Sequence, residues 1–323
     1  MTDTSVALID RLLSAMCAHD GGQAPLAAEV RYTENGQPLA TGDGGEEGER
    51  MPAPWRIDMA DPATGTAVFF GATVETGTPG MLMLRIAERA GAVAEIEAVI
   101  VRLETVGEHG GTVTMFQPRL LVPFDPAGFA APDPALPPRA QGTADASELV
   151  AAADRYFDAI EQNDSRSATF ADACVRRENG VRVTGNPDAP SFNPAVPDYR
   201  PFAMECAEQI DSGLFRRVSR VRGRRHLLVD RERGLVASVA LLDQSGRMHE
   251  IDVPGVGIVP LPGLDGPSAE EQTSDELFGS RNSPNLRVPT TELVAQLLRV
   301  EDGRIAHIEA IARGGPFGMT SGW

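Results

Sequence analysis

Two short stretches of this chain hold side chains whose chemistry could move protons. Tyr32 and Glu34 lie two residues apart in one stretch, and His307 and Glu309 do so in the other. Residues two apart on a β-strand share one face, so the members of each pair would point the same way. A phenol can stabilise a negative oxygen, and a carboxylate or an imidazole can accept a proton. We therefore predict that these four side chains are catalytic residues.

Arginine and histidine side chains supply further candidates. On a strand rich in arginine, alternation places Arg224 and His226 on one face. There His226 could take part in catalysis and Arg224 could bind an anionic oxygen of a substrate. Gly223 is expected to mark a bulge that redirects this pattern. In the first half of the chain, Arg56 and Arg85 could each bind a substrate oxygen.

Each candidate also has a structural interpretation. The segment 34–36 could be a turn whose carboxylate caps backbone amides, and the arginine row is more typical of a solvated surface. His307 could be a buried structural histidine. Cys206 is more typical of a small core residue than of a nucleophile, because no base is assigned to it. The sequence leaves these alternatives open.

The elements that would position these residues occur twice along the chain. A segment reading VRYTENG is similar to one reading VRRENG, and GAVAEIEAVIVR is similar to GRIAHIEAIAR. The matching glutamates are 144 residues apart at Glu34 and Glu178 and 212 residues apart at Glu97 and Glu309. The second copy is therefore the first copy with insertions of roughly 25 and roughly 43 residues between strands, where loops tolerate them.

This repeat divides the 323 residues into two domains of ordinary size. We expect a first domain at 1–123, a proline-rich linker at 124–146 and a second domain at 147–323, with a long insertion at about 244–285. Apolar spacing and alternation predict helices at 8–16, 148–162 (with Ser147 as N-cap) and roughly 201–212. They predict strands at 55–60, 66–75, 81–87, 93–103, 215–230, 234–242, 290–300 and 304–312.

Composition excludes several classes of function. A net charge of −17 disfavours nucleic acid and anionic membrane surfaces as partners, and no apolar run is long enough for a transmembrane helix. All 29 basic residues are arginine, so a lysine Schiff base and a Walker loop are impossible. The three cysteines show neither metal nor disulfide spacing, which predicts a reducing, cytoplasmic setting. We expect no metal and no cofactor.

The order of these elements resembles that of a known superfamily. Helices followed by a curved antiparallel sheet, ending in the turn Asp302-Gly303 and a last strand, resemble the NTF2-like proteins, which include ketosteroid isomerase and SnoaL-type cyclases. The segment PLAAEVRYTENGQPL resembles cofactor-independent diarylpropane lyases, which release formaldehyde from lignin-derived aromatic diols. The second copy, with CVRRENG, RRH and a terminal GMTSGW, resembles a largely uncharacterised subgroup.

The resemblance implies an α+β fold of two tandem cone-shaped domains, each enclosing one apolar pocket. It implies a lyase that cleaves a C–C bond of a small aromatic substrate and releases formaldehyde. The alternatives are an isomerase or dehydratase of a polycyclic substrate, and a non-catalytic binder or scaffold in which the copies form an internal pseudo-dimer. A further homodimer is possible. The unequal insertions favour one active and one supporting domain, with the long insertion over the active pocket.

Overall fold

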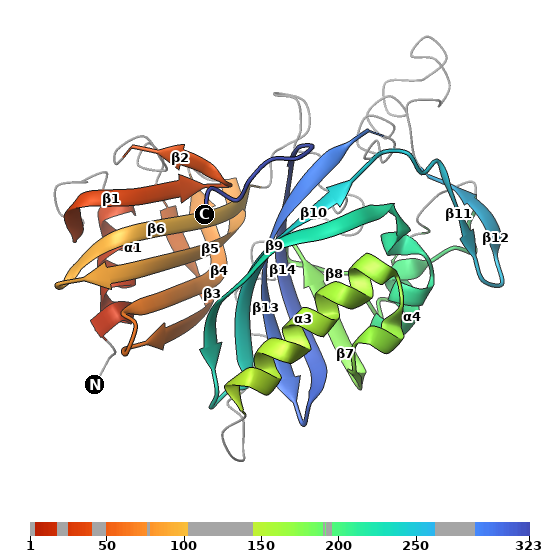
Figure 1. Cartoon of the computed structure of the whole chain (residues 1–323), viewed down its shortest axis with the longest axis horizontal. Helices are drawn as coiled ribbons and strands as arrows, with labels where there is room; N and C mark the ends of the chain where they lie inside the picture. Colours follow the sequence, from red (N-terminus) through yellow and green to blue (C-terminus); the bar gives the residue numbers. More distant parts are fainter. Residues whose placement is uncertain are drawn as a thin grey trace, which may run out of the picture.

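The structure is a computed structural model, and it describes residues 4–17, 25–40, 50–75, 78–102, 145–189, 191, 196–261 and 288–323. The predicted linker lies outside these residues up to position 144, and so do residues 262–287 of the predicted long insertion. Two six-stranded sheets, one two-stranded sheet and a few helices make up the described part (Figure 1).

The first half is a helix packed on a six-stranded sheet with the strand order β2-β1-β6-β5-β4-β3. Apolar residues at helical spacing, Leu8, Leu12 and Met16 among them, place one face of the helix against the sheet. The elements are α1 (Thr4–Cys17), β1 (Leu26–Glu34), β2 (Gln37–Leu39), β3 (Arg50–Asp61), β4 (Thr66–Glu75), β5 (Thr78–Arg89) and β6 (Ala92–Arg102).

The second half repeats this plan with the strand order β8-β7-β14-β13-β10-β9 and adds further elements. Its helical elements are α3 (Ala146–Gln162), η3 (Ser165–Ser167), η4 (Pro201–Ala203), α4 (Cys206–Asp211) and η5 (Leu214–Arg217). Its strands are β7 (Phe170–Glu178), β8 (Val181–Arg182), β9 (Val218–Asp230), β10 (Leu235–Gln244), β11 (Glu250–Val253), β12 (Gly257–Pro260), β13 (Thr290–Glu301) and β14 (Arg304–Pro316).

The N-cap of α3 differs from the predicted one. Asp145, not Ser147, is the N-cap, because its carboxylate accepts a hydrogen bond from the Ser147 amide at 2.7 Å. Asn163 ends the helix in the left-handed conformation, with a φ of 51°. The helix therefore begins at Ala146, two residues earlier than predicted.

The sheets are mixed, whereas a curved antiparallel sheet was expected in each half. In each half the first long strand pairs in parallel with the last, as β1 does with β6 and β7 with β14. Hairpin turns between successive strands predict antiparallel pairs only. The chain instead crosses from β2 to the far edge at β3 and works back, so that β6 arrives beside β1 in the same direction.

The register of this parallel pair is the same in the two halves. Glu34 lies opposite Ala98, and Glu178 lies opposite Ala310. Each alanine directly follows one of the glutamates matched by the sequence repeat, Glu97 and Glu309. The residue after Glu34 and after Glu178 is an asparagine with positive φ, and it donates its backbone amide to the carbonyl of that alanine at 2.8 Å. The repeated motif therefore builds the same turn twice.

The second half differs from the first by what stands between equivalent strands. The connection from β8 to β9 carries η4, α4 and η5, whereas β2 and β3 are separated by ten residues, 40–49. The connection from β10 to β13 carries the hairpin β11–β12, whereas β4 and β5 follow each other directly. The described parts of both insertions pack on the second domain, and Ile251, Val253 and Val259 join its core.

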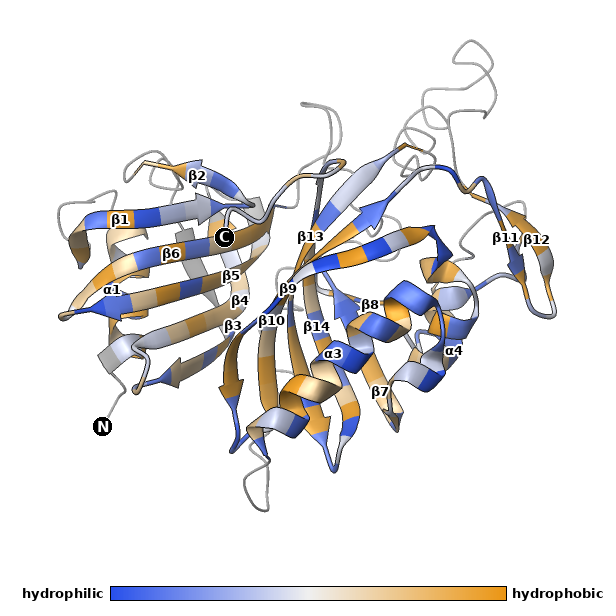
Figure 2. Cartoon of the chain, in the orientation of Figure 1, coloured by the Kyte–Doolittle hydropathy of each residue, from blue (hydrophilic) through white to orange (hydrophobic). Residues whose placement is uncertain are grey.

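Three apolar cores hold the described residues together. One lies between α1 and the first sheet, and one lies between α3 and the second sheet. The third joins the outer faces of the two sheets, where Phe70 and Met83 pack with Leu241 and Leu297. Strand β10 is buried along its whole length because both of its faces are covered. Most of its residues are hydrophobic (Figure 2). Each sheet thus shields the outer face of the other.

Candidate active site

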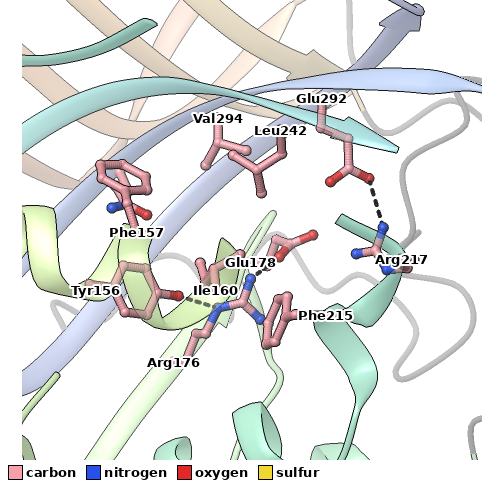
Figure 3. Close-up of a pocket in the computed structure, with 11 residues that line it drawn as sticks. Tyr156, Phe157, Ile160, Arg176, Glu178, Phe215, Arg217, Leu242, Glu292 and Val294 are labelled. Carbon is pink, nitrogen blue, oxygen red and sulfur yellow. Dashed lines mark hydrogen bonds and ion pairs between the residues drawn. The ribbon is translucent and has the colours of Figure 1, made fainter. Parts of the chain in front are cut away.

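A small cavity lies inside the second domain, between α3, β7, η5, β10 and β13 (Figure 3). The space measures about 10 Å³ for the centre of a water-sized sphere, which admits about one water molecule. Charged side chains share its lining with apolar ones: Tyr156, Phe157, Ile160, Arg176, Glu178, Phe215, Arg217, Leu242, Glu292, Val294 and Gln296.

Strand β7 brings two charged side chains into this interior. Arg176 and Glu178 lie two apart, face the same way and form an ion pair, and both are buried. The Nε atom of Arg176 donates a hydrogen bond to the hydroxyl of Tyr156 on α3 at 3.0 Å. Burial acts against the charge of Arg176, but Tyr156 and Glu178 raise its pKa overall. The guanidinium therefore stays charged and tethers α3 to β7.

The carboxyl group of Glu178 is the most perturbed acid of the site. Burial raises its pKa most, Arg176 lowers it, Glu292 raises it and Arg217 lowers it, and the net result is a pKa of about 7 instead of 4.5. A carboxyl group with this pKa is present in both protonation states near neutrality, as a general acid–base requires.

Arg217 supplies hydrogen-bond donors at the other side of the cavity. It is 4% exposed, and its Nη1 atom lies 3.9 Å from the carboxylate of Glu292. Burial lowers the pKa of Arg217, in spite of Glu292 and Glu178 nearby. Among the described residues, no group accepts a hydrogen bond from its Nε or Nη1 atoms, or from Nε2 of Gln296. An oxygen atom of a ligand or water would be stabilised there.

Of the residues predicted in the first half, Tyr32 and Glu34 lie two apart on β1 in continuous register with β6, but they differ in their contacts. Tyr32 is buried in the core between α1 and the sheet. Glu34 accepts a hydrogen bond from Arg102 at 3.0 Å, and 14% of its side chain is exposed. The segment is a turn, and Asn35 is the residue whose side chain accepts a backbone amide, that of Ile100, at 2.9 Å.

The two arginines predicted in the first half have carboxylate partners. Arg56 lies 2.9 Å from Asp10 of α1. Arg85 lies 2.9 Å from Glu95 and 5.1 Å from the centre of the Trp323 ring, on the face that meets the second domain. The structure therefore places Arg85 outside the interior of the first cone.

Arg224 and His226 face α3. Arg224 pairs with two carboxylates of this helix, at 2.7 and 2.9 Å, and the Nε2 atom of His226 lies 3.1 Å from Asp154. Gly223 has a φ of 62°, and the register of β9 against β10 shifts beside it, as the predicted bulge requires. Neither Arg224 nor His226 lines the cavity itself.

His307 and Glu309 form a buried pair, with 2.8 Å between Nε2 and the carboxylate. A register shift between β13 and β14 separates His307 from Ile305. Ile305 therefore joins the core of the second domain, and Ile311 joins the core between the sheets. The register is continuous from His307 to Ile311, so Ile311 shares a face with this pair, whereas Ile305 lies on the other face because the bulge interrupts the alternation.

Sequence reasoning did not select the side chains that converge on the cavity. One signal was present, because Glu178 is the counterpart of Glu34 in the repeat. Arg217 lies in η5, before β9, and Glu292 lies on β13. Only the folded chain brings them towards Glu178.

The cysteines also differ from the prediction. Cys174 of β7 and Cys206 of α4 form a disulfide, although their spacing of 32 residues suggested none. The connection after β8 folds back onto β7, so two thiols that are distant in sequence meet in the core. Cys206 is a core residue, as predicted, but it is bonded rather than free. The disulfide removes the argument from which a reducing compartment was inferred.

The chain belongs to the family described as Domain of unknown function (DUF8021), whose model matches residues 143–312. The match covers the second domain, including β7, η5 and β13 of the cavity. A comparison with curated proteins gives no match. Among the described residues, no helix is long and apolar enough to cross a membrane.

Solved structures with similarity to the chain include NTF2-like proteins. A proposed ketosteroid isomerase from Kribbella flavida is 14% identical over 34% of this chain and 85% of its own, with a TM-score of 0.27. An NTF2-like protein of unknown function from Cytophaga hutchinsonii is 8% identical over 32% of this chain and 92% of its own, with a TM-score of 0.24. A proposed polyketide cyclase from Streptomyces antibioticus is 15% identical over 51% and 90%, with a TM-score of 0.26.

Proposed function

We propose that the second domain is an enzyme that transfers protons on a small organic substrate inside its cone. The observation that carries this proposal is one cavity shared by two unusual groups. Glu178 is a buried carboxyl group with a pKa of about 7, and Arg217 is a buried guanidinium with two nitrogens lacking acceptors among the described residues. Perturbed groups that converge in one cavity are typical of active sites.

The proposed reaction uses these two groups in complementary roles. Ionised Glu178 removes a proton from a C–H or O–H bond of the substrate, and the released electron pair moves onto a carbonyl or phenolic oxygen. Arg217 and Gln296 donate hydrogen bonds to that oxygen as its charge develops. Protonated Glu178 then returns the proton to another atom, which completes an isomerisation, or to a departing hydroxyl group, which completes a dehydration.

The C–C cleavage implied by the resemblance of the first half fits the same groups. The base would take the proton of a primary alcohol, and the C–O bond would become the double bond of formaldehyde. The C–C electrons would pass to the carbon beside an aromatic ring, and that carbon would take up the proton held by Glu178. Phe157 and Phe215 supply apolar walls for such a ring. A ring exceeds the space described, so Phe215 and its short helix η5 must move when substrate enters.

A non-catalytic scaffold is the second candidate, and the small cavity favours it. A cone that admits about one water molecule is nearly filled, and the two sheets cover each other as a pseudo-dimer would. In that case the charged side chains only tie α3, β7 and η5 together. The predicted homodimer would need a surface other than these covered sheet faces.

The test is a ligand screen that also detects products. The full chain would be screened by thermal shift against aromatic diols, steroids and polyketide fragments, with mass spectrometry for isomers and a formaldehyde assay in the same wells. A stabilising compound that is converted by the wild type and not by Glu178→Gln supports the enzyme. Conversion that persists in Glu178→Gln contradicts the assignment of the base.

A matched control keeps this test specific. Arg166→Gln removes an arginine whose side chain is 88% exposed and pairs only locally with Asp164. It should behave as wild type, whereas Arg217→Met should lose ligand stabilisation. If no compound in the screen stabilises the wild type, the scaffold is favoured.

A further inference from the structure

We propose that Asp154, His226 and Ser238 form a relay that carries protons between solvent and the cavity of the second domain. The inference rests on the proposed function, because a buried general acid–base must exchange its proton with water after each turnover. Glu178 is only 3% exposed, so little of its surface can exchange a proton with solvent directly. The three residues come from α3, β9 and β10, and α3 and β10 also line the cavity.

The three residues of the relay are joined to one another by hydrogen bonds. The Nε2 atom of His226 lies 3.1 Å from the carboxylate of Asp154, and its Nδ1 atom lies 2.9 Å from the hydroxyl of Ser238. Exposure falls along this series, from 45% for the side chain of Asp154 to 16% for that of His226 and 1% for Ser238. The relay therefore runs from the surface into the protein.

Its inner end meets the wall of the cavity. Ser238 lies on the same face of β10 as Val236 and Ala240, which belong to the core of the second domain. Its hydroxyl therefore points into that core. Ser238 lies directly opposite Gln296 of β13, and Gln296 lines the cavity. Side chains of such pairs lie roughly 5 Å apart at Cβ, a span that one water molecule closes.

The roles of the atoms follow from the hydrogen-bonding partners. An ionised Asp154 can only accept, so Nε2 of His226 carries hydrogen and Nδ1 accepts from the hydroxyl of Ser238. A proton leaving the cavity binds to the oxygen of Ser238 as the original hydroxyl proton passes to Nδ1. The hydrogen on Nε2 then passes to Asp154 and to water. Each step forms one O–H or N–H bond and breaks another, and a reverse series returns a proton.

The other charged groups around His226 are occupied with one another. On α3, Asp158 and Glu161 pair with Arg224. On β9, Arg225 turns to the opposite face and pairs with Glu97 of the first domain. Asp154 is thus the carboxylate that contacts the ring of His226.

The first domain has the helix position but not the relay. Asp10, the counterpart of Asp154 in the repeat, pairs at 2.9 Å with Arg56, whose guanidinium does not release its proton. Phe69 stands at the strand position of Ser238, and an aromatic ring cannot pass a proton on. The second domain, which holds Glu178 with its raised pKa, is therefore also the domain with the histidine and serine of the relay.

The same three residue types serve as a nucleophilic triad in some hydrolases, but the burial here is reversed. Ser238, the residue that would attack a substrate, is enclosed, whereas the carboxylate of Asp154 is open to water. A nucleophile needs room beside its oxygen for the substrate. Ser238 does not line the cavity, so the geometry suits proton passage and not acyl transfer.

The test measures how fast the proton of Glu178 equilibrates, which requires no substrate. Time-resolved infrared spectroscopy of the full chain after a light-triggered pH jump would follow the protonated carboxyl band, assigned by its loss in Glu178→Gln. We expect the rate to fall at least ~10-fold in His226→Ala and in Asp154→Asn. Added imidazole should restore the rate in His226→Ala only, a rescue that a purely structural histidine would not show.

Glu161→Gln is the matched control, because it weakens another contact between α3 and β9 while leaving the relay intact. It should equilibrate as fast as the wild type. Unchanged rates in both relay variants, or a slow rate that imidazole does not restore, would overturn the relay. A Glu178 band that does not titrate near neutrality would instead overturn the proposed function, so the two failures are distinguishable.

Discussion

Glu34 and Glu178 stand at the same point of two similar sheets, yet their surroundings differ. Each is followed by an asparagine and a glycine with positive φ, and each asparagine accepts a backbone amide at 2.9 Å. Glu34 is partly exposed and pairs with Arg102, the last residue of β6. Glu178 is enclosed beside Arg176, where burial raises its pKa to about 7.

The difference comes from what has been added around a common turn. Tyr32 precedes Glu34 by two residues, and Arg176 precedes Glu178 by two. The insertion before β9 then brings Phe215 and Arg217 over the interior of the second domain. The turn and its strand register serve the fold in both halves, whereas the charge of the interior belongs to the second half.

The largest expected effect is on turnover, once a substrate is in hand. Glu178→Gln should reduce it by at least ~10²-fold, because the amide cannot exchange a proton, while the fold persists. The sequence-based hypothesis places this loss at Glu34→Gln or at His307→Ala instead. Steady-state kinetics of the three variants decides which half is active, and full activity of Glu178→Gln would contradict our assignment.

Removal of the disulfide should destabilise the second half alone. Cys174 and Cys206 close a loop for which the first half has no equivalent, and loop closure of this length is worth roughly 3.5 kcal/mol. Urea unfolding of Cys174→Ser/Cys206→Ser should show this loss. The unfolding free energy of the variant should not change with reductant. That of the wild type should fall to nearly the same value when the disulfide is reduced. Equal stability of both proteins would argue against the bond.

The pH dependence of stability separates Glu178 from ordinary carboxylates. The folded protein holds this proton more tightly than the unfolded chain does. The stability that Glu178 contributes is therefore complete below pH 4.5 and is lost as the pH rises through about 7. The difference in unfolding free energy between wild type and Glu178→Gln should change by roughly 3 kcal/mol across this window. A flat difference would contradict the raised pKa.

The smallest effect is expected where the two halves meet at the C-terminal segment. The indole nitrogen of Trp323 donates a hydrogen bond to the hydroxyl of Thr33 at 2.7 Å. The centre of the indole ring lies 3.9 Å from Cζ of Arg31. Trp323→Ala should cost roughly 1–2 kcal/mol of unfolding free energy. Trp323→Phe keeps the ring and should recover part of this loss, and equal losses in both variants would assign the effect to the hydrogen bond.

Much of the fold could be predicted from the sequence, because it is set by local patterns. Alternation located the long strands, and the repeated ENG motif located the same turn in both halves. The parallel pairing of the first and last strands could not be read locally, since it depends on where the chain crosses the sheet. The NTF2-like resemblance predicted two similar domains, each with helices on a curved antiparallel sheet, but not the parallel pair within each sheet.

The candidate site was harder to predict because its groups act through burial and distance. Because the register of β14 shifts at Ile305, simple alternation does not predict which face each of its side chains occupies. The pKa of Glu178 depends on Arg217 and Glu292, which lie 39 and 114 positions further along the sequence. Comparison of Glu178 with its counterpart Glu34 was the one route from the sequence to the site.

A direct titration of Glu178 tests the central claim most simply. Carbon-13 NMR of the glutamate carboxyl groups of the full chain, with Glu178 assigned by its absence in Glu178→Gln, would give its pKa without any substrate. We predict a titration near pH 7. A midpoint at the usual value of 4.5 would show that the second cone does not perturb this group, and it would contradict the proposed active site.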